Sequence, residues 1–224
     1  MMNPIEGDSE PVGQRVAVGL MKIGLALRHR AWLEAGPRGI TPTQGQILAM
    51  LQRHPEGLSL STIAGQLAVT APTASDAVRV LSEKGLVRKS PAATDRRAIR
   101  VTLTDSGQIE AEQTADWPEF LAEAAETLSE QEQAVFLRAL VKMIRTLQER
   151  GEIPIARMCA GCHYFRPNVH ADPVRPHHCA FVDAPFGDRS LRLDCPDFDA
   201  APPAVQEEIW KAFVGAAPAG PASP

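Results

Sequence analysis

The four cysteines of this 224-residue chain have the residue types and spacing of a metal-binding set. They are Cys159, Cys162, Cys179 and Cys195, and they follow the pattern C-x2-C-x16-C-x15-C. A C-x2-C pair can supply two ligands from one turn, and the later cysteines can complete a four-thiolate site. The alternatives are a redox dithiol, covalent haem at the Cys-x-x-Cys-His motif, disulfides, or ordinary buried cysteines.

The surrounding sequence favours the metal interpretation. Residues 152–203 are rich in Pro, His, Cys, Asp and Arg and show little periodicity, so apolar residues alone are not expected to give them a packed core. The N-terminus resembles no signal peptide, and no apolar run is long enough to span a membrane. We therefore expect a cytoplasmic protein without a membrane partner. In that compartment clustered thiols favour metal ligation, and neither disulfides nor haem attachment is expected. No βαβ pattern supports a thioredoxin-like dithiol.

Two metal centres fit four thiolates. Zinc takes four thiolates, or three and an imidazole, in a closed tetrahedral site. An iron–sulfur cluster also takes four thiolates, and a 4Fe-4S cluster is one form. The order of cysteines and aromatics, which ends in Cys195-Pro-Asp-Phe198, is similar to the cluster segment of high-potential iron–sulfur proteins, and this resemblance favours the cluster. The side chains that would shield such a cluster from water are Tyr164, Phe165, Phe181, Phe186 and Phe198. The histidines that could orient or replace a ligand are His163, His177 and His178.

The preceding two thirds of the chain predict helices and one hairpin. Apolar residues recur at helical spacing, and caps or breakers separate the segments. The expected N-caps are Thr41, Ser59, Thr70 and Ser129, the last in a Ser-x-x-Glu capping box, and Gly85 is an expected helix stop. We expect helices over residues 14–35, 41–54, 59–67, 70–85, 106–151 with a break near Trp117-Pro118, and 205–215, and a basic β-hairpin over 86–104.

The net charge of −4 conceals an uneven distribution. Residues 40–104 carry eight Lys/Arg and four Asp/Glu, whereas residues 105–152 carry four Lys/Arg and eleven Asp/Glu. Because salt screens charges that are more than about 10 Å apart, a locally basic surface can bind phosphates on an acidic protein. Two short helices followed by a basic hairpin therefore predict a winged helix-turn-helix that binds DNA.

The stretch from Thr41 to Gln108 resembles the MarR family of transcriptional regulators. The most specific part is the wing, Asp95-Arg96-Arg97, followed by Val101-Thr102-Leu103-Thr104 and Gly107. The resemblance implies an obligate homodimer with interlocked first and last helices. It also implies a recognition helix in the major groove and a wing arginine in the minor groove.

Carried over residue by residue, the resemblance assigns roles to ten positions. It places Thr70, Thr73, Ser75, Asp76 and Arg79 on the recognition helix, Arg97 in the minor groove with Asp95 orienting it, and Arg88, Lys89 and Arg96 on phosphates. Asp76 departs from the family, in which this position is often basic or a large polar residue. It could accept from a cytosine amino group, cap the helix internally, or pair with Arg79.

The sequence thus predicts a mainly α protein, a winged helix-turn-helix with a two-stranded β-wing and a helical dimerisation region, plus a small irregular Cys-rich C-terminal unit. The expected boundaries are a flexible arm at 1–13, a MarR-like domain at 14–151 (dimerisation helices 14–36 and 105–151, DNA-binding lobe 40–104), a metal-binding unit at 152–203, and a short helix with a disordered tail at 204–224.

The predicted function is that of a homodimeric regulator of transcription, not an enzyme. It would bind a pseudo-palindromic double-stranded DNA operator and carry an iron–sulfur centre that senses redox state, oxygen or iron. The alternative is a regulator of the same family that responds to a small molecule and has a purely structural zinc site. No residue identifies an effector.

Overall fold

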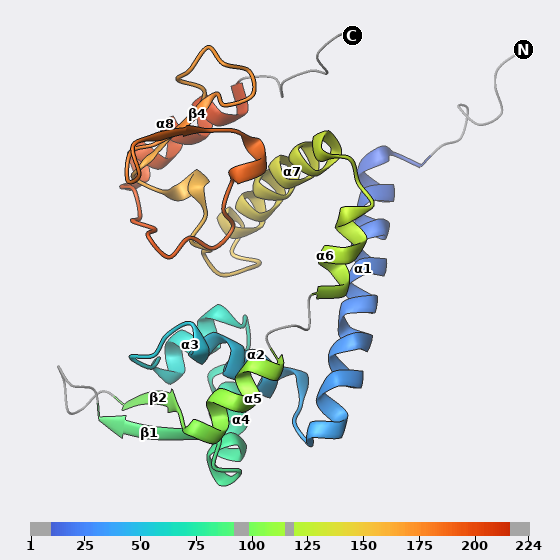
Figure 1. Ribbon diagram of the computed structural model, residues 1–224, viewed down its shortest axis with the longest axis vertical. Helices are drawn as coiled ribbons and strands as arrows, with labels where there is room; N and C mark the ends of the chain where they lie inside the picture. The colour runs from blue at the N-terminus through green and yellow to red at the C-terminus, as the bar shows by residue number, and fades with distance from the viewer. Residues whose placement is uncertain (1–9, 92–98, 115–118, 216–224) are drawn as a thin grey trace, which may run out of the picture. The chain divides into compact units, whose positions relative to one another are not determined.

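The computed structural model describes residues 10–91, 99–114 and 119–215. The chain divides into two compact units, Met1–Ala122 and Glu123–Pro224. In Figure 1 the first unit runs from blue to green and the second from green to red. Within the described residues, no helix has both the length and the apolar character that crossing a membrane requires.

The first unit is mainly helical and carries one antiparallel hairpin. Its elements are α1 (Val12–Ala35), η1 (Gly36–Arg38), α2 (Pro42–Gln52), α3 (Leu60–Gln66), α4 (Ala71–Glu83), β1 (Val87–Pro91), β2 (Ile99–Leu103) and α5 (Asp105–Thr114), and α6 (Glu119–Glu126) crosses into the second unit. Strands β1 and β2 pair from Val87↔Leu103 to Pro91↔Ile99. The prediction of a mainly helical protein with a small antiparallel wing is confirmed.

The helix ends of the first unit form where the sequence predicts them. The side chains of Thr41, Ser59 and Thr70 each accept a hydrogen bond from a backbone N–H in the first turn of α2, α3 and α4. At the end of α4, Gly85 has φ +70°, and its N–H donates to the carbonyl of Ser82. A residue with a Cβ is disfavoured at this φ, so glycine ends the helix at low cost.

The core of the first unit lies between α2, α3, α4 and the wing. Ile47, Leu48, Ile63, Val78 and Val101 are completely buried in it. Leu58 exchanges two backbone hydrogen bonds with Val101 and so attaches the segment before α3 to the wing. This core fixes the orientation of α4 and of β1 and β2 within the unit.

The second unit combines two helices with a small three-stranded sheet. Its elements are α7 (Glu130–Glu149), η2 (Cys159–Gly161), β3 (Phe165–Arg166), β4 (His177–Cys179), β5 (Ala184–Phe186), η3 (Asp188–Ser190) and α8 (Pro203–Gly215). The strand order is β3-β4-β5, and both pairs are antiparallel. The predicted capping box Ser129/Glu132 begins α7, so that expectation is confirmed.

The second unit has a packed core of its own, which includes α7. Val141 of α7 and Phe213 of α8 are completely buried against Phe165 and the turn that contains Ala160. The sequence placed a boundary between residues 151 and 152, whereas the structure divides the chain at Ala122 and Glu123. The reason is physical: one face of α7 supplies apolar surface that the cysteine-rich segment lacks.

Candidate functional site

The exposed face of α4 holds the predicted recognition residues. Thr70 accepts from the N–H of Thr73 at 3.3 Å, and their hydroxyl oxygens lie 2.8 Å apart, so the Thr70 side chain serves as the N-cap. Thr73, Asp76 and Arg79 are exposed, and Ser75 is half-buried. These side chains are therefore accessible to a ligand that binds the exposed face of α4.

Asp76 pairs with Arg79, which is one of the three roles that the sequence left open. Nη2 of Arg79 lies 2.7 Å from Oδ1 of Asp76, and Nη1 lies 2.6 Å from Oε1 of Glu83. The hydrogen bond to Asp76, and to a smaller extent the one to Glu83, raises the pKa of the Arg79 guanidinium. The two carboxylates therefore hold the guanidinium against the exposed face of α4.

The wing presents basic side chains from β1. Arg88 donates from Nε to the Thr102 hydroxyl at 3.2 Å, and both Arg88 and Lys89 are exposed. Sequence reasoning did not single out Arg100, whose guanidinium donates to the carbonyl of Gly57 at 2.6 Å and so attaches the wing to the segment before α3. The predicted wing-tip residues Asp95, Arg96 and Arg97 lie outside the described residues.

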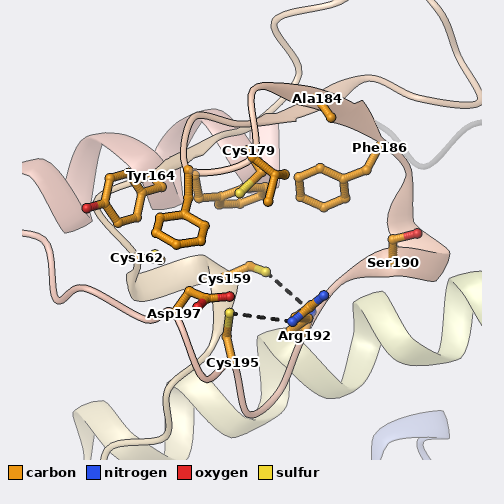
Figure 2. A pocket seen from close by; sticks show the side chains of 13 residues that line it. Cys159, Cys162, Tyr164, Cys179, Ala184, Phe186, Ser190, Arg192, Cys195 and Asp197 are labelled. Atoms are coloured by element: carbon orange, nitrogen blue, oxygen red, sulfur yellow. Dashed lines mark hydrogen bonds between the residues drawn. The ribbon is translucent and has the colours of Figure 1, made fainter.

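The four cysteines line one cavity in the second unit. Cys159 begins the η2 turn and Cys162 directly follows it, Cys179 ends β4, and Cys195 lies in the loop after η3. The cavity has a volume of about 160 Å³ (Figure 2). In Figure 2, Cys179 lies with the rings of Tyr164 and Phe186 on one side, and Cys159 and Cys195 lie with Arg192 on the other.

Aromatic and aliphatic side chains form most of the rest of the cavity wall. They are Tyr164, Phe165, Phe181, Val182, Ala184 and Phe186. The fifth aromatic predicted to shield the site, Phe198, packs in the core of this unit and is not among the lining residues. The polar lining besides the thiols comes from Ser190, Arg192 and Asp197. The cavity therefore presents four thiols in largely apolar surroundings.

The thiols are close enough to influence one another. Burial raises the pKa of the Cys159 thiol, and the other three cysteines raise it further, while the N–H of Arg192 lowers it. That N–H lies 3.3 Å from Sγ of Cys159. All four residues are free cysteines in the structure. Such a set resists carrying four negative charges at once, and a bound cationic centre would relieve the repulsion.

The cavity is wider than a single metal ion requires. Among the described residues, no three His, Cys, Asp or Glu side chains converge closely enough to hold one ion. Zinc–sulfur bonds are about 2.3 Å long, so a closed zinc site leaves no space between its ligands. The volume of about 160 Å³ is instead close to that of an engineered cavity of roughly 150 Å³ that admits benzene. The thiols thus surround room for a group of several atoms.

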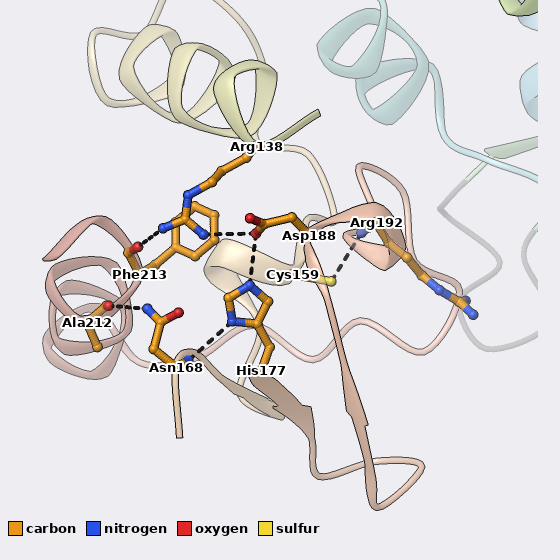
Figure 3. Close-up of polar contacts among 8 residues, drawn as sticks. All are labelled: Arg138, Cys159, Asn168, His177, Asp188, Arg192, Ala212 and Phe213. Atoms are coloured by element: carbon orange, nitrogen blue, oxygen red, sulfur yellow. Dashed lines mark hydrogen bonds and ion pairs between the residues drawn. The ribbon is translucent and has the colours of Figure 1, made fainter. Parts of the chain in front are cut away.

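None of the three histidines singled out in the sequence is among the cavity-lining residues. The completely buried His177 accepts at Nδ1 from the N–H of Asn168 at 3.2 Å, and its Nε2 lies 2.9 Å from Oδ1 of Asp188 (Figure 3). This pattern assigns a neutral ring with its proton on Nε2. His178 contacts Asp183 and His170 through its two ring nitrogens, and His163 packs edge-on against Tyr164.

Two buried arginines of α7 hold the second unit together, and sequence reasoning missed both. Arg138 donates to Asp188 at 2.8 Å and to the carbonyl of Phe213, as Figure 3 shows. Arg145 donates at 3.1 Å to the carbonyl of Ala160, which lies between Cys159 and Cys162. The two arginines are seven residues apart on either side of Val141. Only that spacing could have indicated that they share its buried face.

The Asp188 carboxylate stays charged in this network. Burial by itself would raise its pKa, but hydrogen bonds from His177 and Arg138 outweigh that effect and lower the pKa. Asp188 therefore links α7 to β4 and η3 as an anion. His177 is the first residue of β4, the strand that ends in Cys179, so the network includes this strand.

Comparisons with known proteins match part of the chain. A family model described as MarR family matches residues 38–98, which end before the first cysteine. The HTH-type transcriptional repressor MdtR of Bacillus subtilis is 34% identical over 76 residues, which are 34% of this chain and about half (48%) of MdtR.

Solved structures give longer matches. S. aureus MepR in a DNA-binding conformation is 30% identical, with a TM-score of 0.54, over 59% of this chain and 98% of MepR. A MepR–DNA complex is 29% identical, with a TM-score of 0.53, over 58% of this chain and 97% of that one.

Proposed function

The chain belongs to the MarR family, and on this premise we propose that it is a homodimeric regulator of transcription that binds double-stranded DNA. The observation that carries the proposal is the exposed face of α4 beside a basic wing, on a lobe similar to that of MepR, which has been solved with DNA. A helix presented in this way fits the major groove, and a two-fold dimer calls for a pseudo-palindromic operator.

The homodimer is supported by the exposed apolar surface of α1. Of its 24 residues, only Ala31 and Ala35 are buried. Large apolar side chains are exposed along its length: Val12, Val16, Val18, Met21, Ile23, Leu25, Leu27, Trp32 and Leu33. A soluble protein rarely leaves so much apolar surface in water, and a second copy of the chain would bury it.

For DNA readout we propose a division of labour between α4 and the wing. Thr73, Ser75, Asp76 and Arg79 would face base edges, with Thr70 holding the first turn of α4. Arg88, Lys89 and Arg96 would contact phosphates, which give affinity without sequence information. Arg97, oriented by Asp95, would enter the minor groove, where a narrow A/T-rich stretch attracts a guanidinium.

For the second unit we propose that Cys159, Cys162, Cys179 and Cys195 hold an iron–sulfur cluster. The donor set fits, because such clusters are bound by four cysteine thiolates. The cavity of about 160 Å³ and its apolar wall fit a multi-atom group better than a single zinc ion. When bound, the cluster would supply one-electron redox chemistry that makes the protein responsive to redox state, oxygen or iron supply.

Arg145 gives this centre a direct connection to α7. Its guanidinium is hydrogen-bonded to the carbonyl of Ala160 inside the Cys159–Cys162 turn, and it lies 4.8 Å from the ring of Trp210 on α8. A turn that holds a centre keeps this carbonyl in place, whereas a turn without one is free to move. We infer that occupancy of the cysteine site changes the position or order of α7, and that DNA affinity changes with it.

The first test is anaerobic purification followed by iron, sulfide and zinc analysis and a visible absorption spectrum. Iron with acid-labile sulfide is the expected result. One zinc per chain without iron would instead favour a structural metal and a search for a small-molecule effector. Loaded and metal-free protein are then compared for binding to an operator selected from random DNA. Equal affinity of the two forms would contradict sensing by the centre.

A variant tests the connection through α7. Arg145→Gln is expected to reduce the difference in DNA affinity between the loaded and metal-free forms while iron content is retained. Arg150→Gln is the matched control, because Arg150 is exposed at the end of the same helix. The same difference in affinity in Arg145→Gln and in the wild type would exclude Arg145 as the connection.

A further inference from the structure

Two charged side chains of opposite sign line the cysteine cavity. Among the described residues that line it, Arg192 is the one cation and Asp197 is the one carboxylate. Arg192 contacts Cys159 and Cys195, and Asp197 lines the same cavity (Figure 2). We propose that these two residues tune the reduction potential of the centre in opposite directions: Arg192 raises it and Asp197 lowers it. This inference rests on the proposed iron–sulfur function.

Two hydrogen bonds of its backbone groups hold Arg192 next to Cys159. Its N–H donates to Sγ of Cys159 at 3.3 Å, and its carbonyl accepts from the N–H of Cys159 at 3.1 Å. The buried Leu191 anchors the same segment in the core of this unit. These contacts position the Arg192 side chain beside the cavity without a contribution from a bound centre.

The guanidinium reaches a second cysteine. Nη1 of Arg192 lies 3.9 Å from Sγ of Cys195. A positive charge and N–H donors at cysteine sulfurs stabilise the form of a cluster that carries more negative charge, which is the reduced form. Because Arg192 is exposed, water screens part of this effect. A carboxylate that lines the same cavity acts in the opposite sense, and Asp197 is that carboxylate.

Other charged residues near Arg192 and Asp197 in the sequence do not line the cavity. Arg157 lies 2.8 Å from Asp194, and Arg189 lies 2.6 Å from Glu130. Neither arginine lines the cavity. Arg189 therefore offers a control that removes the same charge three residues away from Arg192. Asp199, which is exposed and does not line the cavity, is the corresponding control for Asp197.

The experiment is a redox titration of the anaerobically purified 224-residue protein, followed by visible absorption. Arg192→Gln is expected to lower the equilibrium constant for one-electron reduction about tenfold, which is about 59 mV, and Arg192→Lys is expected to retain most of the wild-type potential. Asp197→Asn is expected to shift the potential upward. Arg189→Gln and Asp199→Asn are expected to leave it unchanged.

The outcomes separate this inference from the function on which it rests. Wild-type protein without iron and sulfide would overturn both. A wild-type cluster with equal potentials in Arg192→Gln, Asp197→Asn and the two controls would overturn the tuning alone. If Arg192→Gln fails to retain the cluster, Arg192→Lys and Asp197→Asn still decide: a potential unchanged in Asp197→Asn, or a downward shift there, contradicts the inference.

Discussion

The cores of the two units of this protein differ in the polar side chains that they bury. In the described part of the first unit the core is apolar, and the one buried polar side chain is Gln44. The described second unit buries Arg138, Arg145 and His177 together with a few apolar side chains. Buried charges are costly unless they are paired, so the second unit depends on a small number of specific contacts. A fold of this kind is sensitive to the loss of any one of them.

The largest expected effect comes from a cysteine. Cys162→Ser removes a proposed ligand whose side chain is buried. We expect iron content to fall to background, and hydrogen exchange of the amides of β3, β4 and β5 to become much faster. Exchange in α2 to α5 should stay unchanged, because the first unit has its own core. Hydrogen-exchange mass spectrometry measures both units in one experiment.

The matched control is Tyr164→Phe, which alters the cavity wall but no thiol. It should keep both the iron and the exchange pattern of the wild type. Fast exchange in both units of Cys162→Ser would show that the first unit does not keep its structure independently of the second.

The next effect comes from Arg138, which is 4% exposed. Arg138→Ala leaves Asp188 and the carbonyl of Phe213 without this partner. Breaking a buried ion pair by removing one member costs about 3–5 kcal/mol, and we expect a loss near the lower end, from the second unit alone. Thermal unfolding followed by calorimetry measures it. Arg189→Ala, which removes an exposed pair with Glu130, is the control and should cost less than about 1 kcal/mol.

The same network predicts the sign of a pH dependence. The pKa of Asp188 is lower in the folded protein than in the unfolded chain. Its contribution to stability is therefore present above the ordinary pKa of about 3.9 and is lost as the pH falls through the lower folded value. Asp188→Asn should weaken the acid dependence of the second unit's unfolding temperature. An unchanged acid dependence would show that other carboxylates dominate it.

The two units also differ in how much the sequence could predict. In the first unit Thr41, Ser59, Thr70 and Gly85 act on neighbouring residues, so local rules placed the helix ends correctly. The cysteines could be singled out by their spacing, and the structure brings all four to one cavity. The volume of that cavity, on which the proposed cluster rests, follows from the packing of its wall, which no spacing rule supplies.

The contacts of the buried arginines could not be predicted from the sequence. Arg138 contacts residues 50 and 75 positions away in the chain, and an arginine on a helix ordinarily indicates a solvent-facing side. The shift in composition after Gly151 predicts a domain boundary there, whereas α7 belongs to the second core. The sequence indicates the histidines as possible ligands, but both ring nitrogens of His177 form hydrogen bonds, one with Asn168 and one with Asp188.

A smaller effect tests the close packing of the first unit. A Cβ added at Gly107 would lie 1.8 Å from the carbonyl oxygen of Leu86, which belongs to the backbone and cannot easily move. Gly107→Ala is therefore expected to destabilise the first unit by about 2–3 kcal/mol. Gly65→Ala is the control, since an added Cβ there meets nothing within 4 Å, and it should stabilise by up to about 1 kcal/mol. Calorimetry that ranks the two variants in the opposite order would refute this account of the close approach of α5 to Leu86.

The smallest effect comes from the helix caps, and it tests whether the units unfold separately. Ser129 and Thr41 each form a capping box, on α7 and on α2. Replacing either by Ala should cost about 1 kcal/mol. Because α7 belongs to the second core and α2 to the first, Ser129→Ala should lower only the second unit's transition and Thr41→Ala only the first. Each variant is the control for the other. Equal shifts of both transitions would mean that the two cores, despite their different composition, unfold as one.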